Sequence, residues 1–92
     1  MYYVYILTNP FHTVLYVGFT SDLAKRTWQH KQKIVKGFSQ KYNTTILVYY
    51  EHGEDRQVLL EREKQIKDMR RDKKISLIES LNPKWEDLYS KL

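Results

Sequence analysis

The chain has 92 residues, which suits one domain, and it contains no cysteine. The lack of cysteine excludes a disulfide framework, a cysteine nucleophile and a thiolate zinc site. Lys and Arg number 16 against 11 Asp and Glu, and the net charge of +5 favours a polyanionic partner, of which nucleic acid is the commonest in a cell. No apolar run approaches the roughly 18 residues of a membrane span, so we expect a cytoplasmic protein with no membrane partner.

Two segments rich in β-branched and aromatic residues open the chain. Residues 2–7 (YYVYIL) and 14–19 (VLYVGF) are predicted strands, and the Asn-Pro turn between them indicates an antiparallel hairpin. Side chains alternate between the faces of a strand, so Tyr5 lies on one face of the first strand, and Tyr16 and Gly18 share one face of the second.

A helix, a third strand and two more helices are predicted to follow. Residues 20–22 (Thr-Ser-Asp) offer an N-cap and a first-turn acid for the first helix, and Gly37 is its stop signal, before a polar connection over residues 38–44. Leu81 is expected on the inward face of the last helix, which Asn82 and the following proline end. The predicted elements are helices over residues 22–35, 56–69 and 72–80 and a strand over residues 46–50, with a turn at residues 51–55.

This order, β-β-α-β-α-α, predicts an α+β domain in which helices flank a three-stranded antiparallel sheet. We expect the domain to occupy residues 1–83. The remaining residues, 84–92, form a C-terminal tail that packs back on the domain through Trp85, Leu88 and Tyr89.

Glu63 is the acidic side chain with the most unusual predicted position. It shares a helical stripe with Leu59 and Ile66, whereas Glu61 faces a different side. A carboxylate on an inward face is costly unless it is paired or holds a metal ion. The alternative to a metal site is an ordinary ion pair with one of three basic side chains, Arg62, Lys67 or Arg26.

Arg26 and His30 lie four residues apart and therefore share one helix face. The planar guanidinium of Arg26 suits a phosphate, and His30 suits the orientation of a tyrosine hydroxyl or proton donation. The alternative is an ordinary amphipathic helix. Tyr5 and Tyr16 likewise have a simple alternative, as packing residues of their strands. Other tyrosines are interpreted as structural or surface residues: Tyr2, Tyr42, Tyr49, Tyr50 and Tyr89.

The hairpin resembles the paired motif of the GIY-YIG nuclease family. The segment ending in Tyr5 stands where GIY is expected, and the segment from Tyr16 to Gly18 stands where YIG is expected. Tyr3 replaces the first glycine of GIY, which weakens the motif but leaves the tyrosine in place. Valine replaces isoleucine in both motifs, a conservative change.

The helices continue this resemblance over nearly the whole chain. Arg26 and His30 in DLAKRTWQHK match the family's arginine and histidine, and Glu63 in EREKQIK matches its glutamate. Asn82 is the candidate for the family's late asparagine, or it is only a helix terminator. The ending LIESLNPKWEDLY is similar to that of stand-alone, single-domain bacterial members.

The resemblance implies a metal-dependent endonuclease that acts on DNA rather than RNA, in DNA repair or recombination. Glu63 would hold one Mg²⁺ or Mn²⁺ ion, and Arg26 would bind the phosphate. Tyr5 or Tyr16 would be the general base that activates water. Because an unperturbed tyrosine pKa of ~10 is too high for this role, Arg26, His30 and the metal are expected to lower it.

We expect the five candidate catalytic residues to converge on one concave surface; they are Tyr5, Tyr16, Arg26, His30 and Glu63. Several basic and polar residues are expected to bind the substrate beside them. Their alternative is a solvated charged face. Phosphate contacts of this kind make affinity fall steeply with salt. The expected substrate-binding residues are Gly18, Lys25, Lys31, Arg70, Arg71, Lys73 and Asn82, with Lys33 and Lys74 as further phosphate contacts.

Three rival functions stay open at this point. The hairpin and the basic helices suit a nucleic-acid-binding module without catalysis, in which Glu63 would have no role. The chain is also compatible with an interaction protein that kept the fold and lost the activity. A single-metal hydrolase for a smaller phosphodiester is the third alternative.

Overall fold

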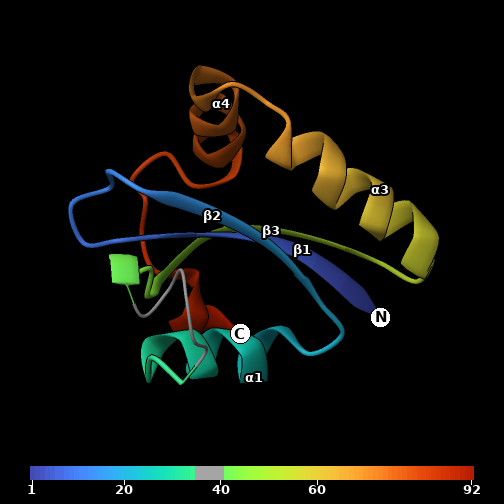
Figure 1. Ribbon diagram of the computed structural model, residues 1–92, viewed down its shortest axis with the longest axis horizontal. Helices are drawn as coiled ribbons and strands as arrows, with labels where there is room; N and C mark the ends of the chain where they lie inside the picture. The colour runs from blue at the N-terminus through green and yellow to red at the C-terminus, as the bar shows by residue number, and fades with distance from the viewer. Residues whose placement is uncertain (35–40) are drawn as a thin grey trace.

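A three-stranded antiparallel sheet forms the centre of the computed structural model, which describes residues 1–34 and 41–92. The strand order is β2-β1-β3, so β1 is central. Helix α1 covers one face of the sheet, and α3 and α4 cover the other (Figure 1). The α+β class and the β-β-α-β-α-α order are therefore confirmed. The elements are β1 Tyr2–Thr8, β2 Leu15–Thr20, α1 Leu23–Lys31, β3 Ile46–Gly53, α3 Arg56–Lys67, α4 Arg71–Leu81 and the short 3₁₀ helix η1 Leu88–Lys91.

Two element boundaries differ from the prediction by more than two residues. Helix α1 ends at Lys31, before the predicted end at residue 35. Residues 35–40, which include Gly37 and part of the predicted polar connection, lie outside the described residues. Strand β3 continues to Gly53 through the predicted turn, because it pairs with the full length of β1 as far as Tyr2. Cross-strand pairing thus overrides the local turn signal.

Strand alternation divides the apolar residues between the two faces of the sheet. Val4, Ile6 and Val17 pack against α3 and α4, where Ile66 and Ile78 are completely buried. The opposite face buries Tyr5, Leu7, Leu23 and Leu47 beneath α1. Each face therefore has its own apolar cluster, and the two tyrosines of the hairpin motif belong to the α1 side.

The inward prediction for Leu81 is wrong, because 53% of this residue is exposed. Leu77 packs against the core instead. Asn82, about one helical turn after the buried Ile78, faces inward instead and is 5% exposed.

Short polar side chains fix the helix starts. Asp22 accepts a hydrogen bond from the Lys25 amide at 3.1 Å, as an N-cap does. Asp55 accepts bonds from the amides of Gln57 at 3.0 Å and Val58 at 3.3 Å at the start of α3. These caps hold α1 and α3 in place against the sheet ends.

The C-terminal segment contacts both faces of the domain. Trp85 packs against the α3–α4 cluster, and its ring stacks on His12 with centroids 4.9 Å apart. Leu88 packs against the α1-side cluster. Asp87 accepts hydrogen bonds from Lys31 of α1 and, at 3.2 Å, from the Leu47 amide of β3. The segment therefore ties α1 to the sheet.

Candidate active site

Tyr5, Tyr16 and His30 form a compact cluster between the hairpin and α1. The Tyr5 hydroxyl lies 3.3 Å from His30 Nε2. The ring centroids are 6.3 Å apart for Tyr5 and Tyr16, and 5.2 Å apart for Tyr16 and His30. Tyr5 is 1% exposed, whereas Tyr16 is partly exposed. The cluster thus offers one buried and one accessible phenol.

Gly18 makes room for the buried phenol. Gly18 and Tyr5 are opposite each other in the β1–β2 register. A Cβ atom at Gly18 would lie 2.4 Å from both Cζ and Oη of Tyr5. Because contacts this short do not occur between real atoms, glycine is required here for the ring to reach His30. Gly18 was expected to bind substrate, and the structure instead places it beneath the ring of a candidate catalytic tyrosine.

Replacing Gly18 with Ala is expected to displace the Tyr5 ring and to lower the free energy of unfolding by about 1–3 kcal/mol, the usual cost of overpacking a core. Urea unfolding measures this loss. Gly53→Ala is the comparison and is expected to cost less, because its Cβ would approach closely only the Cδ2 end of the Leu59 side chain, at 2.7 Å, and not a rigid ring. Wild-type stability in Gly18→Ala would contradict the packing argument.

The pKa of Tyr5 is raised in this structure, whereas a lowered pKa was expected for the catalytic tyrosine. Burial raises the pKa of Tyr5 to about 12, and the nearby Tyr16 adds to the rise. The Arg26 guanidinium beside the hydroxyl lowers this pKa through a hydrogen bond and its charge, but by less. The Glu63 carboxylate raises it slightly further. Within the protein alone, Tyr5 is therefore a protonated hydrogen-bond donor near neutral pH.

His30 is held neutral in the same cluster. It is 1% exposed, and burial together with the positive charge of Arg26 lowers its pKa to about 4. A neutral imidazole with an unprotonated Nε2 accepts a hydrogen bond from Tyr5. His30 thus orients the tyrosine, one of the two roles expected for it, and is a poor proton donor near neutral pH.

His30 is expected to make stability depend on pH between about 6.5 and about 4. Because the folded pKa lies below the unfolded value, the unfolded chain binds the proton first as the pH falls. The stabilisation is present above pH 6.5 and is lost toward pH 4, by up to about 3 kcal/mol, since one pKa unit corresponds to about 1.4 kcal/mol.

Urea unfolding of the wild type and of His30→Gln across this pH range measures the effect. The stability difference between the two proteins should shrink as the pH falls. His52→Gln, at an exposed histidine, should follow the wild type. A difference that does not change with pH would show that the pKa of His30 is the same in the folded and unfolded states.

The helix that carries Glu63 lies on the opposite face of the sheet from α1 (Figure 1), which corrects the expectation of a single concave surface for all five residues. Leu59 and Ile66 of the same stripe are buried against the sheet, and they fix this position of α3. The Glu63 side chain is 18% exposed and pairs with Lys67 at 3.2 Å, so one of the expected ion pairs is present. The negative charge of Glu63 nevertheless contributes to the raised pKa of Tyr5. Helix α3 also contacts the edge strand β2, which carries Tyr16.

A hollow of about 550 Å³ lies beside the cluster, at the end of β2 and the start of α1. Lys25 and Arg26 supply positive charge to it, and Thr20 and Gln29 supply polar groups. Gln29 also accepts a hydrogen bond from Arg26 at 3.4 Å. The positive charge and the hydrogen-bond donors of Lys25 and Arg26 suit a phosphate group. Gln29 was missed in the sequence, although its position one helical turn after Arg26 could have indicated it.

Two of the expected substrate-binding residues hold the fold together instead. Lys31 donates hydrogen bonds to Asp87 and, at 2.8 Å, to the Thr45 carbonyl. Asn82 is the C-cap of α4, and its amide donates to the carbonyls of Val48 at 3.1 Å and Glu86 at 2.8 Å. The helix-terminator interpretation therefore fits Asn82. The Lys31–Asp87 pair spans too many residues for any local pattern to have indicated it.

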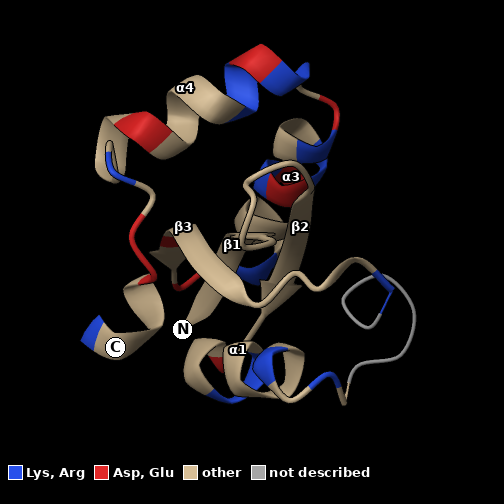
Figure 2. Ribbon diagram, turned by 90° about the vertical axis from the view of Figure 1, so that its left-hand side faces the viewer, with Lys and Arg blue, Asp and Glu red and all other residues tan. Residues whose placement is uncertain are grey.

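Among the described residues, the basic residues of α3 and α4 lie across the sheet from the helix that carries Arg26. Lys and Arg residues occur on α1 and, across the sheet, on α3 and α4 (Figure 2). Arg70 pairs with Asp72 at 3.2 Å, and Arg71 donates to the His12 carbonyl at 3.1 Å. Arg70, Arg71, Lys73 and Lys74 thus lie at the start of α4, apart from the hollow, whereas Lys25 lines it.

The sheet, its flanking helices and the tyrosine cluster define the class of small catalytic domains to which the hairpin motif points. The chain belongs to the GIY-YIG catalytic domain family, whose sequence pattern matches residues 1–76. The resemblance stated from the sequence is therefore confirmed.

Within this family the chain is similar to small UPF0213 proteins. It is 35% identical over 87 residues to the UPF0213 protein CPE1444 of Clostridium perfringens, covering 95% of this chain and 92% of that protein. Its fold matches the solution NMR structure of the UPF0213 protein BH0048 from Bacillus halodurans. That match has a TM-score of 0.60 and 24% identity, over 95% of this chain and 93% of the other. None of the described helices combines the length and apolarity needed to cross a bilayer.

Proposed function

We propose that this protein is a metal-dependent endonuclease that hydrolyses a phosphodiester bond in nucleic acid, with DNA as the preferred substrate. The observation that carries the proposal is the cluster of Tyr5, Tyr16 and His30 beside a hollow lined by Arg26. Membership of a catalytic domain family supports it. A packing role alone would not require a buried phenol, a neutral imidazole and a guanidinium at one place.

Each side chain of the cluster has a distinct role in this proposal. Arg26 binds the scissile phosphate in the hollow and neutralises the charge that develops on it. Tyr16 is the general base, because it is the accessible phenol and can contact the attacking water. Tyr5 is a positioning residue, because it is buried and its hydroxyl lies within hydrogen-bond distance of His30 Nε2.

The residues present fit a hard divalent cation with few protein ligands. Within residues 1–34 and 41–92, no three His, Asp or Glu side chains gather into a metal cluster. Glu63 would therefore hold Mg²⁺ or Mn²⁺ as a single carboxylate, with waters and substrate oxygens as the other ligands, a pattern that Mg²⁺ commonly uses. Its partner Lys67 is exposed and can move away. The ion would stabilise negative charge on the phosphate and the leaving oxygen.

A cleavage assay tests the proposed function. Single-stranded, duplex, flapped and branched DNA, and RNA of the same sequences, are incubated with the protein and Mg²⁺ or Mn²⁺. We expect metal-dependent cleavage of DNA that stops when the metal is chelated. Binding without cleavage of any substrate would instead assign the protein as a nucleic-acid-binding module. Hydrolysis of only a small phosphodiester such as bis(p-nitrophenyl) phosphate would assign it as a hydrolase of small substrates.

A further inference from the structure

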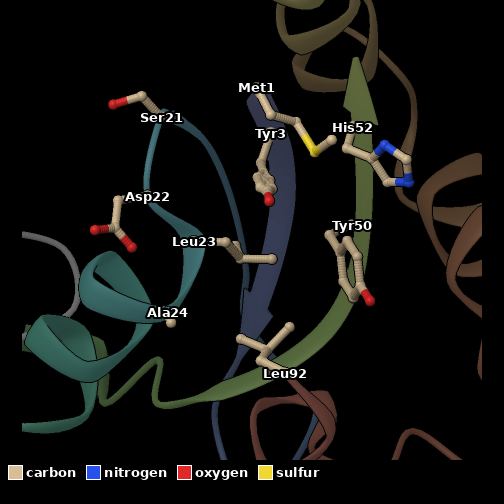
Figure 3. A pocket seen from close by; sticks show the side chains of 9 residues that line it. All are labelled: Met1, Tyr3, Ser21, Asp22, Leu23, Ala24, Tyr50, His52 and Leu92. Carbon is tan, nitrogen blue, oxygen red and sulfur yellow. The ribbon is translucent and has the colours of Figure 1, made fainter. Parts of the chain in front are cut away.

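A second hollow, of about 450 Å³, lies between the start of α1 and the strands β1 and β3 (Figure 3). Three rings from neighbouring strands line it: Tyr3, Tyr50 and His52. The Tyr3 centroid is 6.4 Å from that of Tyr50 and 6.3 Å from that of His52. Tyr3 and Tyr50 pack against the cluster that contains Tyr5, so this hollow opens on the face of the sheet that carries the candidate active site.

The lining suits a flat, uncharged ring. Its other side chains include the apolar Met1, Leu23 and Leu92, and none of its described lining residues is Lys or Arg. Phenol hydroxyls and an imidazole lie at its border and can bond to polar groups on the edge of a ligand (Figure 3). A phosphate would find no Lys or Arg side chain among the described lining residues, whereas a nucleobase would find both stacking surfaces and hydrogen-bonding groups.

The two hollows are neighbours with complementary chemistry. Ser21 and Asp22 line both of them, so they lie on either side of this short segment. The Asp22 carboxylate would repel a phosphate placed over the segment, which leaves Lys25 and Arg26 as the phosphate-binding side. Along β1, Tyr3 is two residues from Tyr5, about 7 Å in a strand.

Tyr3 is also where this chain departs from the glycine of the GIY motif. The departure places a ring where glycine would leave space.

We propose that the hollow lined by Tyr3, Tyr50 and His52 binds one unpaired nucleobase of the strand whose neighbouring phosphate is bound by Arg26. This inference rests on the proposed function, since it assigns the substrate of the same site. A base stacked in this hollow cannot be paired within a duplex at the same time. The substrate class is therefore single-stranded, frayed or flapped nucleic acid rather than continuous duplex.

Fluorescence of a single-stranded DNA with one 2-aminopurine among thymidines tests the base site directly. Binding is measured with the metal chelated, so that the strand stays intact. We expect the wild type to quench the 2-aminopurine by stacking, and Tyr3→Phe and Tyr50→Phe to retain the quenching. Tyr3→Leu and Tyr50→Leu should abolish it and weaken binding about five- to one-hundredfold, the range for loss of one base–aromatic stack. Tyr42→Leu is the matched control at a tyrosine outside the hollow and should behave as the wild type.

Each alternative outcome has its own signature. Unchanged quenching in both leucine variants, with native circular dichroism, would overturn the base site. Cleavage of continuous duplex as fast as of single strands would overturn it too, while the proposed nuclease would stand. Quenching with no cleavage of any substrate would overturn the nuclease and keep the base site. Self-association that Tyr50→Leu abolishes, without any quenching, would assign the hollow to a second copy of the chain.

Discussion

Replacing Glu63 with Gln is expected to lower metal-dependent cleavage at least about a hundredfold, since a bound metal contributes several kcal/mol of transition-state stabilisation and an amide binds a hard cation poorly. The fold should be retained. The change removes only a half-exposed pair with Lys67 and leaves a neutral group at a position that is 18% exposed. The free energy of unfolding should therefore change by less than about 1 kcal/mol. Cleavage of single-stranded and flapped DNA with Mn²⁺, beside a thermal melt, measures both quantities.

Glu61→Gln is the matched control, because Glu61 lies on the same helix with its side chain exposed. It should change neither cleavage nor stability. Nucleic-acid affinity with the metal chelated should be the same in both variants. A wild-type cleavage rate in Glu63→Gln would remove this residue from the site and leave its ion pair with Lys67 as its whole role.

Tyr16→Phe is expected to reduce cleavage by about 10²–10⁴-fold, the usual contribution of a general base. The phenyl ring keeps the packing against Tyr5 and His30, so substrate affinity and stability should stay close to those of the wild type. Single-turnover cleavage at saturating protein measures the chemical step. A log rate that rises with pH in the wild type and is flat in Tyr16→Phe would identify the titrating group.

Tyr5→Phe separates the two tyrosines. It removes the hydrogen bond to His30 and should lower the free energy of unfolding by about 1–3 kcal/mol, as the loss of a buried polar partner does. Its effect on cleavage should be smaller than that of Tyr16→Phe. The opposite order of the two cleavage losses would make Tyr5 the base. Tyr42→Phe, at a more exposed tyrosine, should leave cleavage and stability unchanged.

Much of the fold could be predicted because its signals are local. Alternation in the hairpin placed Tyr5 and Tyr16 on one face, and the structure has both on the α1 side. Residues 20–22 indicated the start of α1 by their N-cap signal, and the structure has Asp22 as the N-cap. The errors fall where non-local packing decides, as with β3, which continues to Gly53 because β1 offers partners there.

The candidate site was less accessible to sequence reasoning. Helical spacing placed Arg26 and His30 on one face, and motif matching found the tyrosines and Glu63. No pattern indicated that Tyr5 would be buried to 1% exposure, and burial reversed the expected direction of its pKa shift. Whether a lysine is available to a substrate depends on partners such as Asp87, which lies far from Lys31 in the sequence.

The sequence by itself determined the family, the order of the elements and the identity of the chemical groups, because these depend on residue type and short-range periodicity. Only the tertiary structure decided which of these groups share one environment. It assigned Tyr16 to the accessible side of the cluster and Tyr5 to the buried side, and it placed Glu63 on a helix across the sheet. It also brought Tyr3 and His52 side by side from two strands. The physical reason is that burial, electrostatic fields and cavities arise from contacts between residues distant in the chain, which local patterns do not encode.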